Sequence, residues 1–140
     1  MLTAMIEYKS NLEVDLDQAI ELYVASTLGV RRPVADRERM AAMFRHANII
    51  ITAWDGELLV GISRAITDYA WYTYLSDLAV RESHQRQGIG KELMRLTQAA
   101  APQASVLLLA APAAEQYYPH VGFTHAPTAW VLRPHERITP

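Results

Sequence analysis

The stretch that decides the fold is Asp77-Leu78-Ala79-Val80-Arg81-Glu82-Ser83-His84-Gln85-Arg86-Gln87-Gly88-Ile89-Gly90-Lys91-Glu92-Leu93-Met94, where a strand leads through a polar loop into a helix. Peptide N–H groups in the first turn of a helix have no acceptor within the helix, and the helix dipole adds partial positive charge there. The two glycines allow close approach to the backbone because they lack Cβ atoms. The stretch therefore predicts a binding site for the phosphates of a nucleotide-bearing ligand.

Its spacing excludes two common phosphate loops. A Rossmann fingerprint needs a third Gly or Ala where this chain has Leu93. A Walker loop needs Ser or Thr after its lysine, whereas Glu92 follows Lys91. Arg81, Arg86 and Lys91 add positive charge around the loop.

Two motifs carry a resemblance to a known family. The first, Gln85-x-x-Gly88-x-Gly90, lies between a predicted strand and an amphipathic helix. The second, Tyr117-Tyr118-Pro119-His120-Val121-Gly122-Phe123, follows at the expected distance. In type, spacing and order they resemble the signatures of the GNAT family of N-acetyltransferases. The resemblance covers nearly the whole chain and implies acetyl transfer from acetyl-CoA to a primary amine, by direct attack in a ternary complex.

The resemblance also implies where the coenzyme binds. In the family two central parallel strands splay apart, and the pantetheine arm enters the gap and bonds to the backbone of the first strand. The pyrophosphate is held chiefly by backbone N–H groups of the glycine loop. The residues implied here are Leu78, Ala79, Val80, Gln85, Arg86, Gln87, Gly88, Ile89, Gly90 and Lys91. Many members carry Asn near the end of the second central strand, where this chain has Ala110-Ala111-Pro112-Ala113-Ala114.

Acyl transfer needs a deprotonated amine and a proton for the leaving sulfur. Tyr118 matches the family's tyrosine and is the expected general acid, with Tyr117 as the fallback; the alternative is a packing role. Asp77 is a possible base if partial burial raises its pKa, and the alternative is a carboxylate that binds a loop N–H. A water chain would also serve. Weaker candidates for the base are Asp68, Glu82 and Glu115.

The acceptor site is less clearly marked in the sequence. Arg31 and Arg32 lie in the loop between two predicted helices, which often borders the acceptor in the family, and they would suit acidic acceptors. The alternative is a pair of solvated charges. Tyr72 and Tyr74 share one face of a strand, where they line an acceptor pocket, a subunit contact or the core.

Composition excludes several classes of protein and site. Thirteen basic and fifteen acidic residues give a net charge of −2, which argues against nucleic acid as a partner. The chain has no cysteine, and its five histidines match no zinc motif, so no metal is expected. No run of about 18 apolar residues predicts a membrane span, and a cytoplasmic protein is expected.

The pattern of apolar residues predicts one α/β domain over residues 1–140, with a GNAT-like mixed sheet and helices on both faces. An antiparallel meander should lead into two parallel central strands joined by a right-handed crossover. The expected strands are Met5–Lys9, Asn48–Trp54, Glu57–Thr67, Tyr72–Val80, Val106–Ala110 and Ala129–Leu132, and the expected helices are Leu16 to Gly29, Arg37–Ala47, Ile89 to Pro102 and Ala113–His120. Trp130 is expected in the core.

Two further expectations concern function and assembly. The alternative to an enzyme is a non-catalytic acyl-CoA sensor or regulatory subunit. Exposed strand edges make a homodimer plausible.

Overall fold

The computed structural model describes residues 5–10 and 13–140, which divide into a larger unit ending at Leu109 and a smaller unit, Ala110–Pro140. Each unit is described by itself. No helix among the described residues is long and apolar enough to cross a membrane.

The larger unit is built on a mixed sheet in the order β1-β2-β3-β4-β5. The first four strands are antiparallel neighbours, and β5 runs parallel to β4, as predicted. Gly56, at φ +59°, makes the tight turn between the second and third strands. The strands are β1 (Ile6–Ser10), β2 (Ile49–Asp55), β3 (Leu58–Thr67), β4 (Tyr72–Val80) and β5 (Ser105–Leu107).

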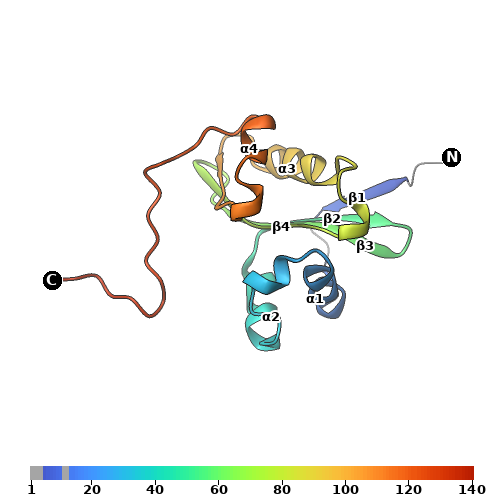
Figure 1. Ribbon diagram of the computed structural model, residues 1–140, viewed down its shortest axis with the longest axis horizontal. Coiled ribbons are helices and arrows are strands. Elements are labelled where there is room, and N and C mark those ends of the chain that lie inside the picture. Colours follow the sequence, from blue (N-terminus) through green and yellow to red (C-terminus); the bar gives the residue numbers. More distant parts are fainter. Residues whose placement is uncertain (1–4, 11–12) are drawn as a thin grey trace. The chain divides into compact units, whose positions relative to one another are not determined.

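Helices cover both faces of this sheet (Figure 1). α1 (Leu16–Ala25) and α2 (Arg37–His46) lie on one face, and α3 (Ile89–Ala100) lies on the other. Asp15 and Asp36 begin the first two helices by accepting backbone N–H groups of the first turn. α1 ends at Ala25, four residues before the predicted stop at Gly29, which instead lies in the short 3-10 helix η1 (Leu28–Arg31).

Each face of the sheet has its own core. Leu22, Tyr23 and Met40 pack with residues of β3 and β4 on the face of α1 and α2. On the other face Ile89, Leu93 and Thr97 of α3 are buried at a spacing of four residues. The buried row continues through Ala101, whereas Ala100 at the end of α3 is exposed.

Ser76 is an extra residue in β4. Arg64 pairs with Asp77, whereas Ala65 pairs with Leu75, so Ser76 has no partner in β3 and forms a β-bulge. The bulge reverses the alternation along β4. Asp77 and Ala79 therefore share the face of α1 and α2 with Tyr72 and Tyr74, which precede the bulge.

Gly61 is the point of closest approach between the sheet and α3. A Cβ atom there would lie 3.0 Å from Leu93 Cδ1, 3.1 Å from Ile89 Cγ2 and 3.3 Å from Ala53 Cβ. We expect Gly61→Ala to lower the free energy of unfolding by about 1–3 kcal/mol, since these buried neighbours have little room to move. Urea denaturation measures the effect. Gly90→Ala is the control, because its nearest contact would be Val80 Cγ2 at 3.7 Å, and an equal loss there would contradict the packing argument.

The smaller unit contains two short helices, η3 (Pro112–Ala114) and α4 (Tyr117–His120). They replace the continuous helix predicted over Ala113–His120. Gly122 follows α4 with φ +104°, a left-handed conformation that glycine commonly adopts after the end of a helix.

Two predicted strands need correction. Residues 129–132 form no strand and Trp130 is 93% exposed, so both the predicted sixth strand and the core position of Trp130 are wrong. The apolar run Ala129-Trp130-Val131-Leu132 suits a strand, but a strand also needs a partner for its backbone groups. The strand predicted over Val106–Ala110 is β5, Ser105–Leu107, and Leu109 beyond it is 49% exposed.

Candidate active site

The loop between β4 and α3 is held in a definite shape by its own side chains. After the 3-10 helix η2 (Glu82–His84), Gln85 Nε2 donates to the Val80 carbonyl at 3.0 Å and draws the loop back onto the strand end. Arg86 (φ +64°) and Gly88 (φ +83°) then take left-handed conformations that turn the chain into α3. No side chain caps the first turn of this helix.

The result is a run of backbone donors without protein acceptors. Within the described chain, the N–H groups of residues 86–91 donate to no protein atom, and the intrahelical bonds begin with Glu92 N–H to the Gly88 carbonyl. Arg86 and Lys91 form no ion pair among the described residues. Such a run at the N-terminus of a 12-residue helix is suited to binding phosphate oxygens.

A shallow depression of about 440 Å³ adjoins this loop. Its lining comes from Thr27, in the turn after α1, and from Glu82, Gln85 and Arg86. We call Gln85 to Lys91 the donor loop. The turn after α1 and the donor loop therefore border the same hollow.

His84 links this loop to the β2–β3 hairpin. Its Nε2 lies 2.8 Å from Asp55 Oδ2, its Nδ1 lies 2.7 Å from Ser83 Oγ, and its side chain is only 14% exposed. This loop histidine is therefore mostly shielded from solvent and tied to Asp55 at the end of β2.

β4 and β5 pair over only three residues each. The register runs from Tyr72 with Ser105 to Tyr74 with Leu107, and β4 then continues to Val80 without β5 beside it. The bulge at Ser76 lies two residues beyond Tyr74, the last β4 residue paired with β5. The edge of β4 from Ser76 to Val80, including the predicted coenzyme contacts Leu78, Ala79 and Val80, is thus left unpaired by β5.

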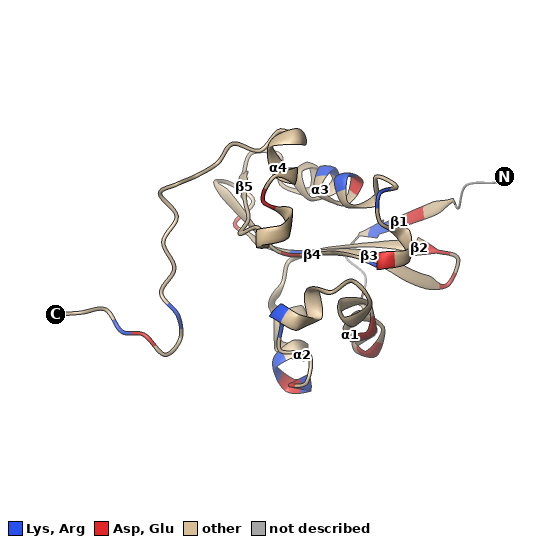
Figure 2. Cartoon of the chain, in the orientation of Figure 1, with Lys and Arg blue, Asp and Glu red and all other residues tan. Residues whose placement is uncertain are grey.

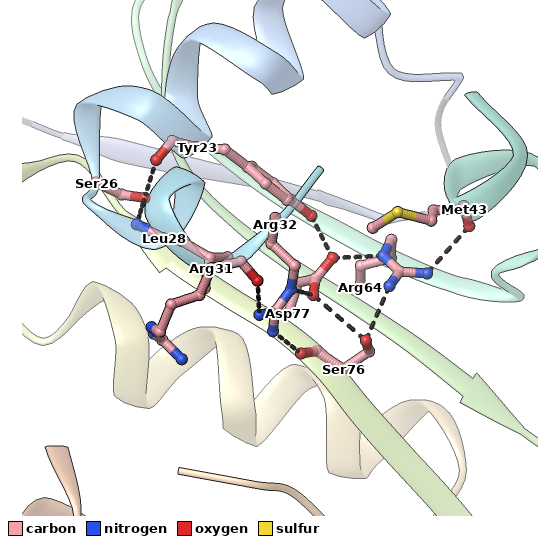
Figure 3. Close-up of polar contacts among 9 residues, drawn as sticks. All are labelled: Tyr23, Ser26, Leu28, Arg31, Arg32, Met43, Arg64, Ser76 and Asp77. Atoms are coloured by element: carbon pink, nitrogen blue, oxygen red, sulfur yellow. Dashed lines mark hydrogen bonds and ion pairs between the residues drawn. The ribbon is translucent and has the colours of Figure 1, made fainter. Parts of the chain in front are cut away.

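Asp77 is the centre of a buried polar cluster, shown in Figure 3. Its side chain is 0% exposed, and it accepts from Tyr23 Oη, Arg32 Nε and Arg64 Nε, each at 2.6 Å. Arg32 also donates to the Ser76 carbonyl at 2.7 Å, and Arg64 donates to Ser76 Oγ at 2.8 Å. We call Tyr23, Arg32, Arg64, Ser76 and Asp77 the Asp77 cluster. Two guanidinium groups thereby hold the bulge of β4 in place.

Electrostatics in the Asp77 cluster oppose a role for Asp77 as base. Burial raises the pKa of this carboxyl, but the hydrogen bonds and charge of Arg64, together with those from Tyr23 and Arg32, outweigh burial and lower the pKa below its usual value. The raised pKa expected from the sequence is therefore wrong. The pKa of Tyr23 is raised well above its usual value by burial and by Asp77, so its phenol stays protonated and keeps donating.

The residues predicted to bind the acceptor are separated by the structure. Arg32 belongs to the Asp77 cluster, whereas the exposed Arg31 points its guanidinium away from Asp77 (Figure 3). Tyr72 and Tyr74 are 49% and 37% exposed, so they are not core residues. They lie on the cluster's face of the sheet, before the bulge.

Tyr117 and Tyr118 lie in α4 of the smaller unit. The Tyr118 ring makes edge contacts with the rings of Tyr117, at 5.6 Å, and Phe123, at 5.5 Å. The Phe123 N–H donates to the Tyr118 carbonyl at 3.1 Å. The second motif of the sequence is thus one local aromatic cluster.

Comparison with known proteins identifies the family. The family model described as an acetyltransferase (GNAT) domain matches residues 46–125, which include the donor loop and the whole second motif. The chain belongs to the GNAT acetyltransferase family. This membership makes it an N-acetyltransferase and implies acetyl-CoA as its co-substrate.

Solved structures of GNAT acetyltransferases resemble this acetyltransferase over most of its length. A GNAT family protein from Streptococcus pneumoniae is 28% identical, with 92% of this chain and 99% of that chain covered and a TM-score of 0.75. An aminoglycoside N-acetyltransferase in complex with CoA shares the fold at 12% identity, with 96% and 97% covered and a TM-score of 0.74. Another, from an uncultured soil metagenomic sample and in complex with sisomicin, is 22% identical, with 96% of each chain covered and a TM-score of 0.64. A comparison with curated protein sequences finds no match.

Three residues of the Asp77 cluster, Tyr23, Arg64 and Ser76, were not found by sequence reasoning. Tyr23 fits the apolar face of α1, and its hydroxyl partner lies 54 residues away. Arg64 carried a signal, because a charged residue stands among buried positions of β3, where it is only 4% exposed.

Proposed function

We propose that this acetyltransferase moves the acetyl group of acetyl-CoA to a primary amine by direct attack in a ternary complex. The run of unpaired backbone N–H groups at residues 86–91 carries the proposal, because it matches the oxygens of a pyrophosphate. Gln85 shapes this loop through its bond to the Val80 carbonyl, and Arg86 and Lys91 add charge. Support for the placement of the pantetheine arm comes from the edge of β4 that β5 leaves unpaired.

In the proposed reaction the amine nitrogen forms a bond to the acetyl carbon as the carbon–sulfur bond breaks. One proton leaves the amine and the departing sulfur takes one up. We assign the second proton to Tyr118, a phenol whose usual pKa of about 10 allows it to protonate a thiolate. Asp77 is unsuited to take the amine proton, because its contacts with Arg32 and Arg64 lower its pKa and make it a weak base. We propose that water takes this proton.

The first test is calorimetric titration of the protein with acetyl-CoA and with free CoA. We expect both to bind. A library of primary amines, screened by release of the CoA thiol, then identifies acceptors. Failure of the folded protein to bind either coenzyme would overturn the assigned coenzyme site, and binding without release from any amine would favour the sensor alternative.

We expect Tyr118→Phe to lower kcat by about 100-fold, since general acid catalysis typically contributes that much or more, while acetyl-CoA affinity stays within about twofold. Steady-state thiol release and calorimetry measure the two quantities. Tyr117→Phe is the matched control, because it removes the neighbouring hydroxyl from the same short helix. Equal losses in both variants, or none in Tyr118→Phe, would remove Tyr118 from the reaction.

A further inference from the structure

The Asp77 cluster carries one more positive than negative charge. Asp77 supplies a single negative charge, while Arg32 and Arg64 each supply a positive one. Among the described residues, no second carboxylate lies within ion-pair distance of either guanidinium. An arginine pair that shares one carboxylate leaves positive potential at the site.

This excess charge belongs to Arg32. The Arg64 side chain is 5% exposed, and its three nitrogens bond to Asp77, Ser76 Oγ and the Met43 carbonyl. The Arg32 side chain is 21% exposed, and it uses three of its five N–H groups, on Asp77, Ser76 and the Arg31 carbonyl. Two donors remain, on a guanidinium whose orientation is already set by the cluster.

Arg32 also stands at a defined point along β4. It binds the carbonyl of Ser76, the bulged residue two positions beyond the end of the pairing with β5 at Tyr74. A coenzyme arm that starts at the donor loop and follows β4 from Val80 reaches Ser76 after about 13 Å, at about 3.3 Å per residue. The acetyl end would therefore lie beside Arg32.

Exposed side chains continue this surface on the same face of the sheet. Tyr74 lies about 7 Å along the strand from Ser76 and pairs with Ile66, and these two side chains are 37% and 47% exposed. Tyr72 follows at 49%. Partly exposed aromatic rings beside a fixed guanidinium offer an organic ion both an apolar contact and a charge partner.

From this juxtaposition we propose that the acetyl acceptor is an amine that also carries a carboxylate, and that Arg32 binds this carboxylate. A single carboxylate neutralises the excess charge of the cluster, whereas a phosphate dianion would reverse it. The two N–H groups that Arg32 leaves unused, one on each terminal nitrogen, can donate charge-assisted hydrogen bonds to carboxylate oxygens. The inference rests on the proposed function and specifies the acceptor class of the same site.

The test compares amines that differ only in the anionic group. A panel of α- and ω-amino acids and their primary amides is titrated calorimetrically into the protein saturated with free CoA, which permits binding without reaction. We expect the best carboxylate to bind about 10- to 100-fold more tightly than its amide, the effect of one charge-assisted contact. The same pairs are then compared by thiol release from acetyl-CoA, as a ratio of kcat/KM.

Variants assign the preference to Arg32. Arg32→Gln should bring the ratio of carboxylate to amide near one, and Arg32→Lys should restore part of it by returning the charge without the paired donors. Arg39→Gln is the control, since it removes an exposed arginine with no side-chain partner among the described residues. Acetyl-CoA affinity is followed in every variant, so that loss of the fold is not mistaken for loss of preference.

The outcomes separate the two proposals. Carboxylate preference in binding without thiol release would leave Arg32 standing as a carboxylate-binding residue and refute the proposed transfer. Thiol release from amines at similar rates with and without a carboxylate would support the proposed transfer and refute the carboxylate assignment. A panel in which no carboxylate binds better than its amide, or an aminoalkyl phosphate that binds more than tenfold better than the best carboxylate, overturns the inference even if Arg32→Gln fails to fold.

Discussion

Asp77→Asn is expected to lower the free energy of unfolding by about 3–5 kcal/mol, the usual cost of removing one partner from a buried ion pair. Asp77 is completely buried, and its loss leaves the guanidinium of Arg64, itself 4% exposed, without its counter-charge. Urea denaturation at pH 7 measures the change. A loss below about 1 kcal/mol would show that the cluster does not hold the bulge of β4.

The matched control is Asp17→Asn, which removes a carboxylate paired with Arg37 on the surface. The two side chains of that pair are 77% and 60% exposed, so we expect a change within about 0.5 kcal/mol. Equal effects at the two sites would contradict the role assigned to burial.

The pH dependence of Asp77→Asn follows from the lowered pKa of the carboxyl. A carboxylate with a depressed pKa stabilises the fold fully above its unfolded pKa of about 3.9, and the contribution is lost as the pH falls through the folded value. The difference between wild type and variant should stay constant from about pH 5 to 8 and shrink below about pH 4. The pH dependence of kcat/KM should accordingly show no ionisation of Asp77 above about pH 5. An ionisation there that disappears in Asp77→Asn would show that Asp77 is the base.

Gly88→Glu should weaken acetyl-CoA binding by at least about 100-fold. At φ +83°, Gly88 stands at the turn into α3, in the middle of the unpaired donors. A carboxylate there meets a pyrophosphate of like charge, and two like charges 4 Å apart cost about 4 kcal/mol at an effective dielectric constant of 20. Calorimetric titration of the folded variant with acetyl-CoA measures the loss of affinity.

Gly56→Glu isolates the electrostatic effect from backbone strain. Gly56 also has a positive φ, +59°, and a Cβ atom at either glycine would meet nothing within 4 Å. Both variants should therefore lose similar stability through the left-handed conformation, about 1–2 kcal/mol. Only Gly88→Glu should lose coenzyme affinity, and comparable affinity in the two variants would place the pyrophosphate elsewhere.

Figure 2 shows positions of basic and acidic residues together on α2 and α3 and only acidic ones on α1, so ligand recognition depends on local arrangements rather than on a broad field. At the donor loop the arrangement is encoded in consecutive residues. In the Asp77 cluster it is assembled from α1, the loop after η1, β3 and β4.

That difference explains what could be predicted of the fold and the site. The meander, the parallel strand after α3 and the glycine loop follow from alternation, turn residues and helix starts, all of which act over a few residues. The strand predicted at residues 129–132 does not form, because a strand needs a pairing partner and a short apolar run specifies none. The single domain over residues 1–140 stays a prediction.

By itself the sequence determined the glycine loop at the start of α3 and the order of strands and helices in the larger unit, because helix starts and apolar periodicity are local properties. Tertiary structure alone decided the role of Asp77. One extra residue at Ser76 turns this carboxylate to the face of α1 and α2, where residues 13 to 54 positions away in the chain ionise it and hold it. The pKa of a carboxyl depends on such neighbours and on burial, which arise only when distant segments pack together.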